Sequence, residues 1–109
     1  MNLANLLADL GERDEARRLY TEVIDGRTAQ LGAQHTDTLA AKNNLALLLD
    51  DLGERDEARR LYTEVIDGYT AQLGAQHTDT LRAKTNLASL LKNLRERERD
   101  TQPPSSILS

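Results

Sequence analysis

The 109-residue sequence has no cysteine, no tryptophan and no phenylalanine, and it has only three tyrosines and two prolines. Without cysteine there can be no disulfide, no thiolate metal ligand and no thiol nucleophile. Large aromatic side chains, which normally supply much of a core's buried area, make up only 3% of the chain. A single globular core would therefore be thin, and burial has to be spread over many leucine and alanine contacts.

Other absences narrow the class of partner. No apolar run approaches the roughly 20 residues of a membrane span, and the first residues lack the charged and apolar regions of a secretory signal. The 14 Lys and Arg residues are interspersed with 18 Asp and Glu residues, for a net charge of −4. Nucleic-acid binding calls for a basic surface instead. We expect a cytoplasmic protein with no membrane or nucleic-acid partner.

What the sequence does contain is an internal repeat. Residues 2–42 align with residues 44–84, and 37 of the 41 aligned positions are identical. The four differences are Asn5/Leu47, Ala8/Asp50, Arg27/Tyr69 and Ala40/Arg82. A third, diverging copy begins at Asn86 and continues to about Arg97. The period is 42 residues, and we expect the chain to be an excerpt from a longer array.

Apolar residues within one unit recur at steps of three and four, which predicts two amphipathic helices separated by Gly53 and closed by Gly74. Neither helix can bury its apolar face alone, so neighbouring pairs have to stack. The predicted fold is an all-α solenoid of about two and a half helix–turn–helix repeats over residues 1–100, followed by a disordered tail at 101–109. The predicted helices span about 2–10, 14–31, 37–52, 56–73 and 79–98.

The joint between units, "GAQHTDTL", contains the only two histidines. One interpretation is a His–Asp couple for proton transfer or metal binding, built on His35, Asp37, His77 and Asp79. The other is a linker, in which Thr36 and Thr78 cap the next helix and the aspartates complement its positive end. No nucleophile or third ligand is tied to either copy, so we favour the linker. We predict no catalytic residue, no metal site and no cofactor.

Two further positions lead to local predictions. Asp56 is the expected N-cap of the second helix in its unit. Gly26 and Gly68 fall inside predicted helices, where glycine is unfavourable. Either the next unit's backbone approaches too closely for a Cβ, or the helix bends there. We favour the close approach.

The combined pattern Asn-Leu-Ala-x-Leu-Leu-x-x-Leu-Gly, Asp-Glu-Ala-x-x-Leu-Tyr and Leu-Gly-x-x-His-x-Asp-Thr resembles the tetratricopeptide repeat. It is most similar to the 42-residue variety found in kinesin light chains, although Thr36 and Thr78 replace a usual proline, and Arg13 and Arg55 a usual aromatic. The resemblance covers residues 2 to about 94. It implies a right-handed superhelix, a non-enzymatic interaction scaffold and a protein or peptide partner.

In that family the first helix of each pair lines a concave groove that commonly holds an extended peptide. Carried over to this sequence, the predicted groove residues are Asn2, Asn5, Asn43, Asn44, Leu47, Asp51, Arg82, Asn86, Ser89 and Lys92. Three of the four differences between repeats, at 5/47, 8/50 and 40/82, fall on this wall. Only Asn5, Asn44 and Arg82 fit the family's arrangement for gripping a C-terminal carboxylate, which argues against that ligand.

The last helix has no second helix after it to cover its apolar side. We therefore expect Leu87, Leu90, Leu91 and Leu94 to be uncovered and to drive self-association, giving a homodimer through the terminal helices. The alternative to an interaction module is a purely structural or engineered repeat fragment with no dedicated ligand.

Overall fold

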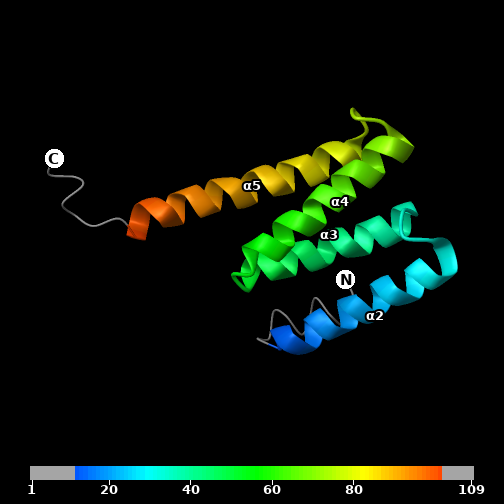
Figure 1. Cartoon of the computed structure of the whole chain (residues 1–109), viewed down its shortest axis with the longest axis horizontal. Helices are drawn as coiled ribbons and strands as arrows, with labels where there is room; N and C mark the ends of the chain where they lie inside the picture. The colour runs from blue at the N-terminus through cyan, green and yellow to red at the C-terminus, as the bar shows by residue number, and fades with distance from the viewer. Residues whose placement is uncertain (1–11, 102–109) are drawn as a thin grey trace, which may run out of the picture.

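The structure is a computed structural model that describes residues 12–101, and side chains as far as Arg95. This range holds four α-helices and no strand (Figure 1). They are α2 (Arg13–Leu31), α3 (Thr36–Asp51), α4 (Arg55–Leu73) and α5 (Thr78–Thr101). The first three begin within one residue of the predicted positions, and α5 continues three residues past its predicted end. The predicted helix at 2–10 and residues 102–109 of the predicted tail lie outside the described residues.

Each helix packs on the next one along the chain, and α3 also touches α5 (Figure 1). The second helices, α2 and α4, have 19 residues each and the same sequence apart from Arg27 and Tyr69. The result is a stack of antiparallel helix pairs in which α3 lies between α2 and α4. The prediction of an all-α solenoid of helix–turn–helix repeats is confirmed.

One apolar cluster runs through all four described helices and holds the stack together. Its small members, Ala16 and Ala58, are fully buried and let neighbouring helices approach closely. Its large members, Tyr20 and Tyr62, fill the space between helices. The remaining members are Leu45, Ala46, Leu48, Leu49 and Leu90. A smaller cluster lies nearer the ends of the helices and contains Leu39, Val65, Tyr69 and Ala83.

The turn inside the complete helix pair depends on Gly53, whose φ of +87° is the left-handed conformation that favours glycine. The N-cap of α4 is Glu54, and its side chain makes no capping hydrogen bond. The predicted cap at Asp56 is wrong, because Asp56 already lies in the first turn of the helix. An ion pair from Asp50 to Arg55, at 3.0 Å, instead joins the end of α3 to the start of α4.

The two helical glycines differ. A Cβ on Gly68 would lie 2.6 Å from Cδ1 of Leu39, so the predicted close approach is present there, although a side chain of the preceding helix makes it rather than the next unit's backbone. A Cβ on Gly26 would meet no described atom within 4 Å. The prediction is therefore wrong for Gly26, which is exposed.

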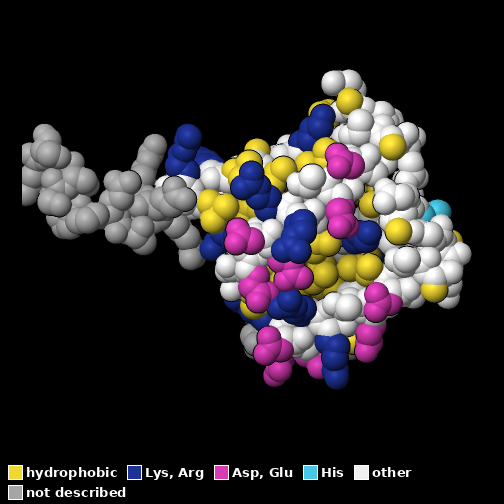
Figure 2. Space-filling model, in the orientation of Figure 1, with side chains coloured by type: hydrophobic (Ala, Val, Ile, Leu, Met, Phe, Trp, Pro, Cys, Tyr) yellow, Lys and Arg dark blue, Asp and Glu magenta, His cyan; other side chains and the backbone are white. Residues whose placement is uncertain are grey.

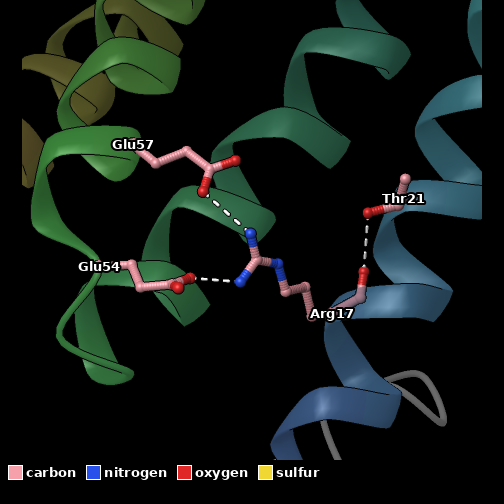
Figure 3. Close-up of polar contacts among 4 residues, drawn as sticks. All are labelled: Arg17, Thr21, Glu54 and Glu57. Atoms are coloured by element: carbon pink, nitrogen blue, oxygen red, sulfur yellow. Dashed lines mark hydrogen bonds and ion pairs between the residues drawn. The ribbon is translucent and has the colours of Figure 1, made fainter.

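Arg17 links α2 to α4 (Figure 3). Its guanidinium, on α2, forms ion pairs with Glu54 and with Glu57 at the start of α4, the latter at 3.0 Å. The Thr21 hydroxyl donates a hydrogen bond to the Arg17 carbonyl, one turn back, at 2.9 Å. The two ion pairs of Arg17 therefore connect α2 to the start of α4, on either side of the intervening α3.

Candidate binding surface

The joint before α5 shows what the histidines do. His77 is the residue before the helix, and its Nδ1 accepts a hydrogen bond from the backbone N–H of Asp79 at 3.1 Å. The Thr80 hydroxyl, fully buried, donates to the Gly74 carbonyl at 2.9 Å. The joint before α3 repeats both bonds with His35 and Thr38, at 3.0 and 2.9 Å. The predicted threonine caps are wrong: Thr78 is the first helical residue, and histidine supplies the cap.

The His77–Asp79 pair has the geometry of a helix cap. His77 Nδ1 lies 3.9 Å from the Asp79 carboxylate, and both side chains are exposed. The same ring nitrogen is occupied as the acceptor of the cap bond. Among residues 12–95, whose side chains the structure describes, no three His, Asp or Glu side chains form a set that could hold a metal ion.

A shallow polar hollow lies where the first helices of successive pairs meet. We call it the α3–α5 hollow, and its lining residues are Thr36, Asp37, Ala40, Asn43, Asn44, Tyr69, Asp79 and Arg82. Its volume of about 260 Å³ is below the roughly 300–1,000 Å³ of small-molecule sites. A hollow of this size suits a single side chain or a short stretch of extended backbone.

The structure brings together part of the predicted groove. Asn43, Asn44 and Arg82 line the α3–α5 hollow. Asn86 lies beside it and donates its amide N–H to the Asn43 side-chain carbonyl at 3.3 Å, which joins α5 to α3. Leu47, Asp51, Ser89 and Lys92 are exposed on the same two helices but do not line the hollow. Asn2 and Asn5 lie outside the described residues.

The most informative residue that the sequence analysis missed is Tyr69. It comes from a second helix, α4, and is only 6% exposed where it borders the hollow. The sequence did contain a signal for Tyr69. The repeats differ at four positions, three of these were assigned to the groove, and Arg27/Tyr69 is the fourth. In the first unit Arg27 uses its guanidinium to donate to the Asp37 carbonyl at 2.8 Å.

The charges around the hollow are mixed. Burial raises the pKa of Tyr69, the Asp79 carboxylate raises it further, and Arg82 acts in the opposite direction. Arg82 is exposed and lies 3.7 Å from Asp79, one turn away on the same helix. Its guanidinium can therefore turn from Asp79 to an incoming acceptor without leaving a buried charge unpaired.

The leucines predicted for self-association are placed differently from one another. Leu90 is fully buried in the main apolar cluster, and the expectation that it is uncovered is wrong. Leu87 and Leu94 are half-buried against the same cluster. Leu91 is 39% exposed, and so is Leu81 at 42%, which the sequence analysis did not select. Consecutive residues of an α-helix point about 100° apart around its axis, so neighbouring leucines such as Leu90 and Leu91 face different surroundings.

Stacked helix pairs with this spacing of alanine, tyrosine and glycine define a helical repeat protein. The sequence model of the tetratricopeptide repeat matches residues 1–71, and the chain belongs to this family. The family generally mediates protein–protein interactions. No curated protein matches the sequence. None of the described helices is both long enough and apolar enough to cross a membrane.

Proposed function

We propose that the chain is a non-enzymatic interaction module that holds an extended peptide segment of a partner protein along α3 and α5. The observation that carries the proposal is the α3–α5 hollow, where amides and charged groups of different helices face one space. Asn44 can both donate to and accept from a peptide backbone. Arg82 and Tyr69 stand at two of the four positions where the repeats differ. Variation at a groove in an otherwise constant scaffold is what a set of peptide-binding units needs.

Selection from a displayed library of random peptides, followed by calorimetry on the peptides recovered, tests the proposal. Asn44→Ala should weaken binding, and Asn93→Ala is the matched control, because Asn93 is exposed on α5 and does not line the hollow. Arg82→Ala, which restores the residue of the first unit, should weaken acidic peptides most. Recovery of no peptide, or equal loss in both asparagine variants, would count against the groove.

A second candidate function is self-assembly, and the exposed Leu81 and Leu91 support it. On α5 these leucines lie along one helix face with the exposed Ala88. Figure 2 shows hydrophobic surface over α5 with charged side chains beside it. Large hydrophobic side chains gathered on one helix face are typical of a surface that another protein covers. The two functions use different surfaces and are compatible.

We also propose that the chain belongs to the 42-residue, kinesin-light-chain-like variety and acts in the cytoplasm. The 42-residue period and the 19-residue second helices support the assignment to that variety. The absence of cysteine is compatible with a reducing compartment.

A further inference from the structure

The near-identical repeats allow each α5 residue to be compared with the α3 residue 42 positions earlier. Leu39 and Leu49 on α3 are fully buried, whereas their equivalents Leu81 and Leu91 on α5 are 42% and 39% exposed. Ala46 is likewise buried, and its equivalent Ala88 is exposed. We call Leu81, Ala88 and Leu91 the open α5 face. On α3 the corresponding face is covered, and Leu39 packs there with Val65 and against Gly68 of α4.

The same comparison can be made between α2 and α4, and it shows that α2 residues are exposed where their α4 equivalents are buried. α2 has the sequence of α4 at 18 of 19 positions, with Arg27 in place of Tyr69. Val65 on α4 is fully buried, but its equivalent Val23 on α2 is 41% exposed. The Leu39 side chain packs against Gly68, whereas no described atom lies within 4 Å of a Cβ built on Gly26. We call Val23 and Gly26 the open α2 face.

We propose that the open α5 face of one copy of this chain is covered by the open α2 face of a second copy, in the register that α4 has on α3. Leu81 then packs against Gly26 of the second copy, as Leu39 does against Gly68. The inference rests on the self-assembly proposed above and names its partner surface.

Charge supports the same register. Lys42 on α3 pairs with Glu64 on α4 at 3.4 Å, and the equivalent pair between copies is Lys84 with Glu22 of the second copy. Arg17 bridges Glu54 and Glu57, and the equivalent contact brings Arg59 to Glu12 and Glu15 of the second copy. Neither Lys84 nor Arg59 forms an ion pair with another described residue. Figure 2 shows Lys and Arg side chains over α5, and both carboxylates and basic side chains over α2.

The two faces are different surfaces, so the contact is head-to-tail. Each docked pair still presents one open α2 face and one open α5 face, and further copies can add. A two-fold dimer, in contrast, would use one surface twice and stop at two copies. The predicted dimer is therefore the first step of a longer linear series, whose mean mass increases with protein concentration.

Sedimentation equilibrium of the full chain, from low micromolar to near-millimolar concentration, tests the proposal with Gly26→Ala. In the monomer an alanine at 26 would have no described atom within 4 Å of its Cβ and suits the helix, so the melting temperature should stay equal or rise. Between copies its Cβ occupies the space that Leu81 needs. Forcing a methyl into a packed contact should weaken association roughly 5- to 140-fold. Thr28→Ala is the matched control and should associate like the parent, because both Thr28 and its equivalent Thr70 are exposed.

Charge exchange gives a second measurement. Glu22→Lys alone and Lys84→Glu alone should each associate less than the parent chain at low salt, and an equimolar mixture of the two should recover association. If the parent chain keeps the mass of one copy throughout, self-assembly itself is wrong. If it assembles but Gly26→Ala and the parent associate equally, or the mixture does not recover, only the proposed register is wrong. Neither result affects peptide binding at the α3–α5 hollow.

Discussion

The side chain of Leu39 occupies the space that a Cβ on Gly68 would need, with Cδ1 at 2.6 Å and Cδ2 at 2.9 Å from that position. Gln34 Oε1 is also close, at 2.7 Å, but belongs to an exposed side chain that can swing away. Leu39 is fully buried and cannot. A glycine in the middle of a long helix is thus required by the helix that packs on it.

Gly68→Ala should therefore lower the free energy of unfolding, although alanine favours the helix. The clash costs about 1–3 kcal/mol and the helical preference returns about 1 kcal/mol. Gly26→Ala carries the same preference without the clash, so the difference between the two variants isolates the packing cost. Urea unfolding at low protein concentration measures both. Equal stabilisation by the two substitutions would contradict the contact with Leu39.

His77→Ala should destabilise the chain by about 1 kcal/mol, because the backbone N–H of Asp79 loses its acceptor. His77→Asn should recover most of that loss, since asparagine is a good N-cap. Thermal unfolding followed by circular dichroism compares the two variants with the parent. Equal loss in the alanine and asparagine variants would show that the imidazole contributes by packing rather than by capping.

Tyr62→Phe should leave stability unchanged or slightly raised. The ring is fully buried, and its hydroxyl has no hydrogen-bond partner among the described residues. Removing a buried polar atom without a partner removes a desolvation cost. Tyr62→Ala is the control for the ring itself and should cost about 3–5 kcal/mol. A clear loss of stability in Tyr62→Phe would reveal a hydrogen bond to that hydroxyl.

Stability should decrease in alkaline solution. Burial, and then the Asp50 and Asp51 carboxylates, raise the pKa of the Tyr62 phenol above its usual value. The folded state therefore favours the protonated phenol. The contribution is complete below the unfolded pKa of about 10 and is lost as pH rises above it. Urea unfolding as a function of pH measures the slope. Tyr62→Phe should flatten it, and an unchanged slope would assign the effect to other groups.

Arg17→Ala should cost no more than about 1 kcal/mol, because its ion pairs with Glu54 and Glu57 are partly exposed to solvent. The loss should shrink at high salt. Arg59→Ala is the matched control, since it occupies the same position in the next unit and forms no ion pair with another described residue. Measured at low protein concentration, it should be close to neutral. A larger loss for Arg59→Ala than for Arg17→Ala would contradict the bridge.

Part of the candidate site could be predicted because the sequence resembles the tetratricopeptide repeat, whose groove positions carry over to the first helix of each pair. Asn43, Asn44 and Arg82 were selected through that resemblance, and they line the α3–α5 hollow. Tyr69 was missed because it reaches the hollow from the second helix, and a single-helix pattern carries no information on how the next helix leans. The caps were assigned to the wrong residues for a related reason. His77, Thr78 and Asp79 all have side chains suited to a helix start, and only the backbone path selects the histidine.

The sequence by itself determined an all-helical chain of stacked pairs, because a 42-residue period, a three-to-four apolar spacing and glycine stops leave no other way to bury so many leucines. The tertiary structure decided which of two near-identical copies is covered. Leu39 and Leu81, or Gly68 and Gly26, share a local sequence but differ in burial. Burial depends on which helix packs against a residue. Two segments of identical sequence can therefore be buried to different extents, and their own residues do not determine which one is covered.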